Sequence, residues 1–442
     1  MATDPATDVV RHEALWFEPS VDGFGPLLDA VGDASVVLIG EATHGTHEFY
    51  GTRAELTKAL IMRKGFNLVA VEADWPDAYR ANRWVRHVAS ESGAAGALGD
   101  FTRFPRWMWR NREVVEFLEW LRGENHGHDL TEQVGFYGLD LYSLHASIEA
   151  VLAYLRKVDP EAAERARDRY RCFEAYREDT ESYGYAATLG ISKSHEDEVV
   201  AQLTELRRHA AEYAARDGRL AADEPFVAEQ NARVVLHAEE YYRAMFGGRV
   251  ESWNVRDQHM METLDGLLAF ASHDTGSARA VVWAHNSHIG DARATDMGRG
   301  GELSLGQLVR QKHGPRAFLI GQTMHTGSVT AAANWDDPAE RKRVRPSLEG
   351  SVERVFHDVG LARFLLVLRG SKAAQALSEE RLERVIGVVY RPESERMSHY
   401  VRAKVPEQFD AVLHTDDTAA LQPLERWARD ELDLPETYPS GM

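Results

Sequence analysis

The fold is decided by the stretch Val36-Val37-Leu38-Ile39-Gly40-Glu41-Ala42-Thr43-His44-Gly45-Thr46-His47-Glu48. Its first four residues are all aliphatic and predict a buried strand. A glycine ends the strand, and a carboxylate, two threonines, two histidines and a second carboxylate follow before a helical pattern begins. In α/β proteins, binding and catalytic groups lie at the carboxyl ends of strands. We therefore expect a functional site at this turn.

The residues on either side extend the pattern into a β-α-β unit. Residues 48–64 have helical spacing, Gly65 ends that helix, and residues 67–71 predict a second strand. Such a unit implies a parallel sheet. Further strands are predicted at residues 134–138, 280–283, 317–320, 364–368 and 411–414. Further helices are predicted at residues 24–31, 79–88, 305–311 and 424–432.

The strand signal disappears between residues 144 and 272. This part is rich in Ala, Glu and Arg and has helical periodicity. The predicted fold class is α/β, a mostly parallel sheet with flanking helices and a large helical insertion that forms a cap over the active cleft. The predicted parts are a leader (1–34), the first part of the α/β core (35–143), the helical insertion (144–272) and the second part of the core (273–442).

The composition narrows the class of partner. The 442 residues include 51 Lys and Arg against 70 Asp and Glu, a formal charge of −19, which disfavours nucleic acid and anionic membranes. There is no run of about 18 apolar residues and no secretory signal, so we expect a cytoplasmic protein without membrane spans. The only cysteine is Cys172, which precludes an intrachain disulfide. The oligomeric state is not predicted.

Three predicted strand ends carry groups suited to catalysis, and these groups are Glu41 and His44, Glu72 and Asp74, and His285 and His288. Parallel strands bring such ends to one edge of a sheet, so residues far apart in sequence can meet there. Histidine, with an ordinary pKa near 6.5, suits a general base, and a carboxylate can orient its second ring nitrogen. Such a base can activate water directly, without a covalent intermediate.

Other interpretations fit the same residues. A serine nucleophile is disfavoured because no Gly-x-Ser-x-Gly occurs. A metal centre is an alternative, with imidazole and carboxylate ligands of the type that zinc uses, namely His44, Glu72, His285 and His288. A third possibility is a non-enzymatic protein whose histidine cleft binds a small ligand or haem. Glu41 and the threonines could instead cap the following helix, and Arg53 could pair with Glu72 for stability alone.

The ordered motifs resemble the erythromycin esterase family. The resemblance is carried by Gly40-Glu41-Ala42-Thr43-His44-Gly45, Val71-Glu72-Ala73-Asp74 and Trp283-Ala284-His285-Asn286-Ser287-His288. Arg53, Gly138-Leu139-Asp140 and Arg256-Asp257 fit the same pattern. The resemblance extends from about residue 35 to residue 414. It implies an α/β core with a helical portion and an active cleft between the two.

The resemblance also implies an activity and a role for each motif residue. Family members that confer resistance hydrolyse the ester of a macrolide ring, so we expect a small-molecule ester or macrolide as substrate and no cofactor. His44 would be the general base, with Glu41 and Glu72 orienting or polarising it. Arg53, His285 and His288 would hold the substrate carbonyl or stabilise the oxyanion. Substrate contacts are expected from Asp74, Trp75, Trp107, Arg110, Asp140, Asp257 and His325. The natural substrate is not predicted.

Overall fold

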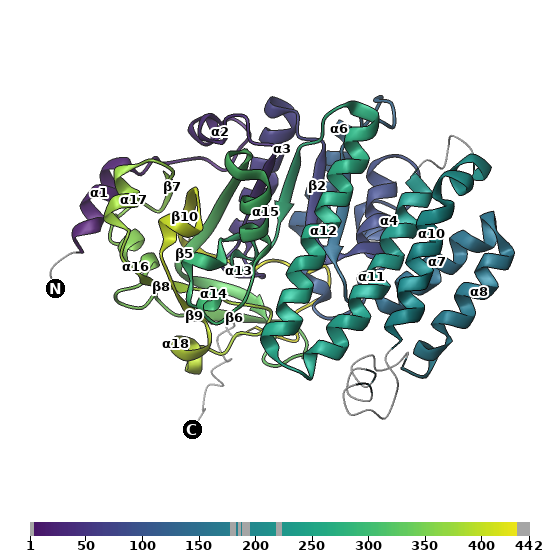
Figure 1. Ribbon diagram of the computed structural model, residues 1–442. Coiled ribbons are helices and arrows are strands. Elements are labelled where there is room, and N and C mark those ends of the chain that lie inside the picture. Colours follow the sequence, from purple (N-terminus) through teal and green to yellow (C-terminus); the bar gives the residue numbers. More distant parts are fainter. Residues whose placement is uncertain (1–3, 177–182, 184–186, 188–194, 218–222, 431–442) are drawn as a thin grey trace, which may run out of the picture.

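A computed structural model describes residues 4–176, 183, 187, 195–217 and 223–430. Within these residues a nine-stranded sheet forms the centre of the molecule (Figure 1). Its strands are β1 (Val36–Ile39), β2 (Leu68–Asp74), β3 (Gly135–Asp140), β4 (Ala280–Trp283), β5 (Ala317–Ala331), β6 (Glu340–Val344), β7 (Arg363–Val367), β10 (Ala411–Thr418) and β11 (Arg429–Asp430). A separate two-stranded sheet pairs β8 (Arg381–Arg384) with β9 (Tyr400–Ala403).

The central part of the large sheet is parallel, as predicted. The order is β11-β6-β5-β1-β4-β2-β3, and β10 lies between β5 and β7. β5, β1, β4, β2 and β3 all run in one direction, whereas β6 and β7 are antiparallel to their neighbours β5 and β10. The carboxyl ends of β1, β4, β2 and β3 are therefore adjacent, which is the arrangement that the strand-end motifs require.

Helices surround this sheet and extend beyond its β3 edge. The N-terminal half contains α1 (Pro5–Glu13), α2 (Gly25–Val31), α3 (His47–Lys64), α4 (Trp75–Val85), α5 (Ala94–Ala97) and α6 (Arg112–Glu124). The central part contains α7 (Leu144–Val158), α8 (Pro160–Tyr170), α10 (Glu196–Asp217), α11 (Asp223–Met245) and α12 (Arg249–Thr275). The remaining helices are α13 (Asn286–Ile289), α14 (Asp296–Arg299), α15 (Leu305–His313), α16 (Val352–His357), α17 (Lys372–Ala376), α18 (Glu395–Ser398) and α19 (Val405–Gln408).

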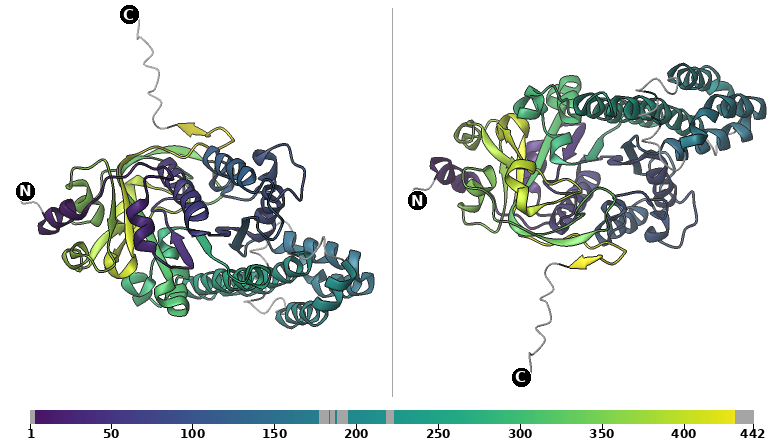
Figure 2. Two further views of the ribbon diagram at one scale, coloured as in Figure 1. Left: turned by 90° about the horizontal axis from the view of Figure 1, so that it is seen from above. Right: turned by 90° about the horizontal axis from the view of Figure 1, so that it is seen from below.

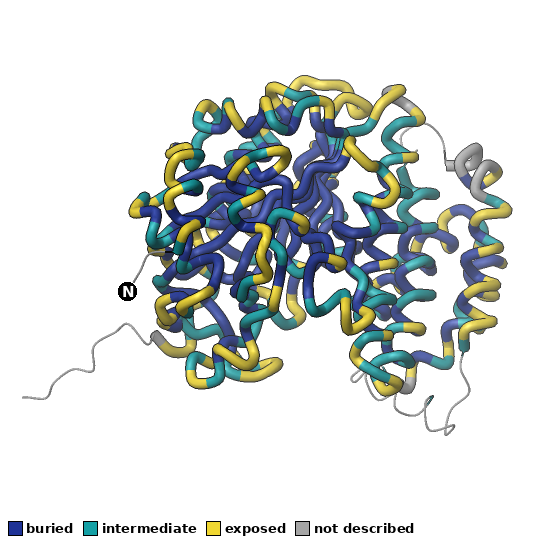
Figure 3. The backbone as a smooth tube through the Cα atoms, turned by 60° about the vertical axis from the view of Figure 1, so that its left-hand side comes forward, coloured by how far each residue is buried: buried dark blue, intermediate teal, exposed yellow. Residues whose placement is uncertain are grey.

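The strands are buried on both faces. In β1, Val37 and Ile39 enter one hydrophobic cluster, whereas Val36 and Leu38 enter the other, because successive side chains of a strand point to opposite faces. The first cluster includes Leu60 of α3, and the second includes residues of α12 and α15. Figure 3 shows this buried centre beneath exposed outer loops. Burial on both faces explains why β1 is continuously apolar.

The predicted helical insertion is present as α7, α8, α10, α11 and α12. The first four helices gather beside the β3 edge, and α12 returns along the sheet (Figures 1 and 2). α7, α8, α10 and α11 share a third hydrophobic cluster that includes Leu155, Leu203 and Val235. None of the described helices is long and apolar enough to cross a membrane.

Some predicted elements differ from those in the structure. The helix predicted at residues 424–432 is wrong for its described part, because Arg429 and Asp430 form β11 at the edge of β6, and residues 431–432 lie outside the described residues. The strand predicted at residues 317–320 continues to Ala331 despite its glycines. It continues because it pairs with β10 and then with β6. The leader contains an unpredicted helix, α1, whose Asp4 side chain accepts a hydrogen bond from the Ala6 backbone N–H.

Candidate active site

A cavity of about 790 Å³ opens at the carboxyl ends of the four adjacent parallel strands. The strand-end motifs supply His44, Glu72, Asp74, Asp140, His285 and His288 to its lining. The facing wall comes from the first two turns of α12, from residues 101–109 and from residues 385–401. The strand ends thus converge on one enclosed space, as their positions in the sequence predict.

His44 is held by a buried carboxylate. Its Nδ1 lies 2.9 Å from Oε1 of Glu41, and the other carboxylate oxygen lies 3.1 Å from the guanidinium of Arg53. Arg53 is fully buried between the rings of Tyr50 and Trp283. Because the Glu41 carboxylate pairs with Arg53, it accepts the hydrogen bond that it shares with His44. The ring proton of His44 that makes this bond is therefore on Nδ1. Glu41 therefore orients His44 and does not cap α3.

The second nitrogen of His44 is available for chemistry. His44 lines the cavity, and its Nε2 has no hydrogen-bond partner among the residues that the structure describes. Gly45 fixes the turn that carries His44, because its carbonyl accepts a hydrogen bond from the Thr330 N–H at 2.9 Å. A Cβ on Gly45 would lie 1.8 Å from the Thr330 carbonyl oxygen, so only glycine fits there. The backbone thus presents an unprotonated imidazole nitrogen to the cavity.

His285 has both ring nitrogens engaged. Nε2 donates to the Ile386 carbonyl at 3.2 Å, and Nδ1 accepts from the Ser287 hydroxyl at 2.8 Å. The ring lies tilted beside that of His44, with centroids 4.7 Å apart. Burial and the neighbouring His44 lower the pKa of His285 to about 3. It is therefore a neutral wall residue that fixes the start of α13.

We expect this histidine to make the protein sensitive to acid. Its pKa is about 3 when folded and near 6.5 when unfolded, so below pH 6.5 the unfolded chain binds the proton more readily. Between pH 7 and pH 5 the free energy of unfolding should fall by about 2 kcal/mol from this group alone. Urea denaturation of the wild type and of His285→Gln at both pH values measures the effect. Between the two pH values, the unfolding free energy of the variant should fall by about 2 kcal/mol less than that of the wild type. An identical fall in both proteins would contradict the lowered pKa of His285.

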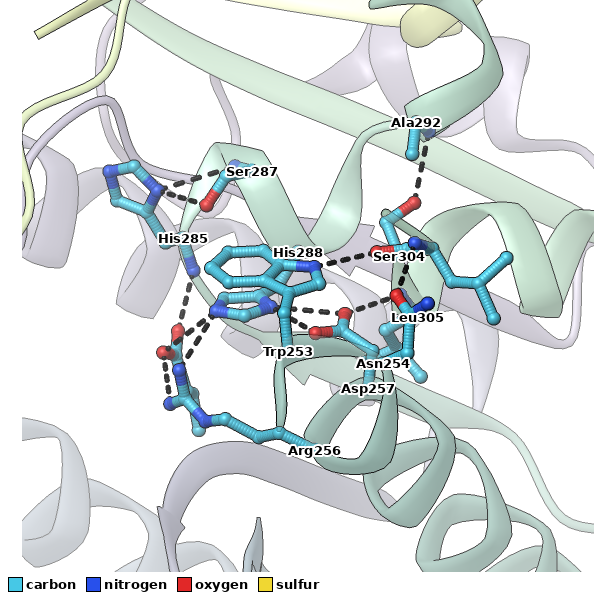
Figure 4. Close-up of polar contacts among 12 residues, drawn as sticks. Trp253, Asn254, Arg256, Asp257, His285, Ser287, His288, Ala292, Ser304 and Leu305 are labelled. Atoms are coloured by element: carbon cyan, nitrogen blue, oxygen red, sulfur yellow. Dashed lines mark hydrogen bonds and ion pairs between the residues drawn. The ribbon is translucent and has the colours of Figure 1, made fainter. Parts of the chain in front are cut away.

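His288 forms the second histidine–carboxylate pair (Figure 4). Its Nδ1 lies 2.9 Å from Asp257, and its ring stacks on Trp253 with centroids 4.4 Å apart. Burial lowers the pKa of His288, but the carboxylates of Asp257 and Glu72 outweigh this effect and raise the pKa above its usual value. His288 thus differs from His285, whose pKa is lowered.

Arg256 connects the two acidic strand ends, Glu72 and Asp140. Its Nη2 lies 2.7 Å from Glu72 and 2.6 Å from Asp140, and Nη1 lies 3.1 Å from Nε2 of His288. Burial alone would raise the pKa of Glu72, but His288 and Arg256 hold it well below its usual range. Glu72 is therefore an ionised carboxylate beside the guanidinium of Arg256. Its second oxygen accepts from the His285 backbone N–H at 2.8 Å.

These donors fit a metal ion poorly. Within the described parts of the chain, no group of three or more His, Cys, Asp or Glu side chains is arranged to hold a metal. Of the four candidate ligands, Glu72 and His288 face the guanidinium of Arg256, and both nitrogens of His285 are engaged. A cation added there would meet the positive charge of Arg256 at close range.

The other expected site residues divide into two groups. Asp74 and Asp140 line the cavity, and Arg103 binds Asp74 at 3.0 Å. The residues outside the lining are Glu41, Arg53, Trp75, Trp107, Arg110, Asp257 and His325. Glu41 and Asp257 lie directly behind the lining histidines, and Arg53 lies behind Glu41.

The remaining four residues are held by other contacts. Trp75 and Trp107 belong to the hydrophobic core. Arg110 binds Glu425 at 2.8 Å. His325 stacks on His357 with ring centroids 3.6 Å apart.

The sequence did not single out several lining residues. Trp253 and Tyr142 both touch catalytic groups or their partners. Arg256 was named beside Asp257 in the resemblance but was given no role there. The pair Arg256-Asp257 carried a usable signal, because it belongs to the ordered motifs of the resemblance. Phe104 and Trp335, whose rings pack edge to face at 5.0 Å, also line the cavity and carried no such signal.

Comparisons with known proteins agree with this architecture. The erythromycin esterase family model matches residues 61–418. An Escherichia coli protein named erythromycin esterase type II is 22% identical over 367 residues, which cover 80% of this chain and 85% of that protein.

Two solved structures have a similar fold. One, a Bacillus cereus protein, has a TM-score of 0.79 at 19% identity and covers 96% of this chain and 100% of its own. A mutant erythromycin esterase in its open conformation has a TM-score of 0.66 at 15% identity and covers 94% of this chain and 97% of its own. The family match spans most of the chain, and it includes the strand ends with Glu72, Asp140, His285 and His288. The chain belongs to the erythromycin esterase family.

Proposed function

We propose that this protein hydrolyses carboxylic esters by a water molecule that His44 activates, without a metal and without a covalent intermediate. The observation that carries the proposal is the pair of contacts at His44. Glu41 holds Nδ1, and Nε2 faces a cavity of about 790 Å³. A histidine oriented in this way is the arrangement of a general base.

The chemistry balances with the groups present. Nε2 of His44 takes a proton from water while the water oxygen bonds to the ester carbonyl carbon, which forms a tetrahedral oxyanion. The carbon–oxygen bond to the alcohol then breaks, and the protonated His44 returns the proton to the leaving alkoxide. Glu41 and Arg53 keep the ring oriented throughout, and the carboxylate stabilises the imidazolium that forms between the two steps.

The cavity lining near Glu72 supplies positive charge for the oxyanion. His288, with its raised pKa, and Arg256 both line the cavity beside Glu72. Charged donors that are fixed before the reaction stabilise a developing oxyanion without reorganisation. Arg256 therefore joins the oxyanion-stabilising role that the resemblance gave to Arg53, His285 and His288.

The cavity supports a large ester as substrate. Its volume lies in the range of about 300–1,000 Å³ for sites that enclose drug-sized molecules. Phe104 and Trp335 add aromatic surface to the lining. A macrolactone or a related natural-product ester matches this size and chemistry, and macrolide inactivation is the biological role that we propose.

A hydrolysis screen by mass spectrometry tests the function. The purified protein is incubated with macrolides and simple aryl esters, with and without EDTA, beside His44→Gln and Ser287→Ala. We expect a product heavier by one water that EDTA does not affect, that His44→Gln abolishes and that Ser287→Ala retains. Loss of turnover in Ser287→Ala would indicate a serine nucleophile, and loss with EDTA would indicate a metal. Either result would contradict the proposal.

The charge on His288 should appear in the pH profile. Because Asp257 raises the pKa of His288, kcat/KM should fall as the pH rises through that pKa. Asp257→Asn removes this contribution, so the alkaline limb should move to lower pH. Asp265→Asn is the control, since Asp265 lies on the same helix and pairs with Lys312 at 2.7 Å. An alkaline limb that stays in place in Asp257→Asn would show that the charge of His288 is not used.

A further inference from the structure

A second cavity, of about 400 Å³, lies between α4, α7 and α11. These helices lie side by side at the β3 edge of the sheet (Figure 1). The second cavity shares no lining residue with the first. The strand-end motifs contribute nothing to it, so ester hydrolysis leaves it unexplained.

Asn231 carries a buried polar atom of this cavity that has no hydrogen-bond partner among the described residues, and Nε of Arg86 is another. Asn231 of α11 is 1% exposed, and its Nδ2 donates to the Val227 carbonyl at 2.9 Å. Its Oδ1 has no hydrogen-bond partner among the described residues. Burying an amide oxygen without a donor costs free energy, so such atoms in native proteins call for an explanation. A ligand that donates a hydrogen bond to Oδ1 would supply the missing partner.

The charged side chains of the cavity include one more cation than anions. Arg86 lies 2.5 Å from Asp223, and Lys157 lies 2.7 Å from Glu224, so these four side chains neutralise one another. Arg83 also lines the cavity, is exposed, and forms no ion pair within the described ranges. The cavity therefore has a net positive charge, which favours an anionic group on its occupant.

The rest of the lining is mainly apolar or aromatic. Pro76 and Tyr79 of α4 face Ala150, Ala153 and Tyr154 of α7 across the space. Small alanine side chains leave room for a flat ring system, and Tyr79 offers an aromatic surface. We propose that this cavity binds an aromatic carboxylate that carries a hydroxyl group. The hydroxyl donates to Oδ1 of Asn231, and the carboxylate meets Arg83.

Binding of 6-hydroxy-2-naphthoate to the full chain tests this site. The fluorescence of this probe reports binding by intensity and anisotropy. The wild type should give saturable binding with one site. Ala150→Phe fills the cavity and should weaken binding by at least about tenfold, whereas Ala146→Phe, at an exposed position of the same helix, should leave it unchanged. Asn231→Leu should weaken binding by about tenfold, the effect of one hydrogen bond.

Two further variants separate this site from the first cavity and from misfolding. His44→Ala should bind the probe as the wild type does, and Arg83→Gln should bind it more weakly. Arg83 is on the surface, so its variant reports on the site even if Ala150→Phe does not fold. Three results would each overturn the proposal. These are no saturable binding to the wild type, an affinity in both Asn231→Leu and Arg83→Gln that equals that of the wild type, or loss of binding in His44→Ala. None of them depends on ester hydrolysis.

Discussion

His44→Ala is expected to lower kcat/KM for any ester that the protein hydrolyses by about 10²–10⁴-fold, the usual contribution of a general base. The reason is geometric. His44 is the residue that presents a ring nitrogen without a partner to the cavity, because both nitrogens of His285 are engaged and Nε2 of His288 faces Arg256. Initial rates at saturating and limiting substrate measure the loss, which should fall mainly on kcat.

His47→Ala is the matched control for this experiment. His47 belongs to the same turn, but its side chain is half exposed, pairs with Glu113 and does not line the cavity. It should keep kcat within about twofold, since surface changes away from a site have small effects. If His47→Ala lost as much activity as His44→Ala, the loss would reflect the turn and not the base.

Arg256→Met is expected to lower both stability and activity. Its guanidinium is shared by Glu72 and Asp140, which are both buried, so the variant leaves two carboxylates without their cation. Removing one partner of a buried ion pair costs about 3–5 kcal/mol of unfolding free energy. Denaturant unfolding measures this loss. In parallel, kcat should fall, because positive charge is lost where the oxyanion develops.

The same helix provides the control for Arg256. Arg249 pairs with Glu302 at 2.6 Å, and its own side chain is 78% exposed although Glu302 is buried. Arg249→Met leaves one buried carboxylate without its cation, so it should cost less than Arg256→Met, which leaves two. Arg256→Lys keeps the charge but cannot reach Glu72, Asp140 and His288 at once, and it should restore only part of the stability. A cost for Arg256→Met as small as that for Arg249→Met would show that the network does not hold the site together.

The central strands could be predicted because their burial leaves a simple pattern. β1 and β4 are short, continuously apolar and buried on both faces, so their residues alone identify them. β5 was predicted only in its first four residues, since its later part contains threonines, a histidine and two glycines that are typical of a turn. Its pairing with β10 and β6 holds this part extended, and such long-range pairing has no local signal.

The site was predictable where the reactive groups follow strands in sequence. Glu41 and His44 are three residues apart, and a parallel sheet brings them to the edge that also carries Glu72. Arg256 reaches the same edge from α12, on the far side of the helical insertion, and no sequence spacing places it there. Trp107 was expected to contact substrate because it lies near the site in sequence, but its side chain packs in the hydrophobic core. Large aromatic side chains commonly pack in this way.

The central claim is that the neutral ring of His44 carries its proton on Nδ1 and presents an unprotonated Nε2 to the cavity. Nitrogen-15 NMR of the ring in protein labelled at histidine measures the tautomer directly, with His44→Ala identifying the signal. At mildly alkaline pH the account predicts a protonated Nδ1, an unprotonated Nε2, and loss of this preference in Glu41→Ala. A proton on Nε2 in the wild type would contradict it, because His44 could not then accept a proton from water.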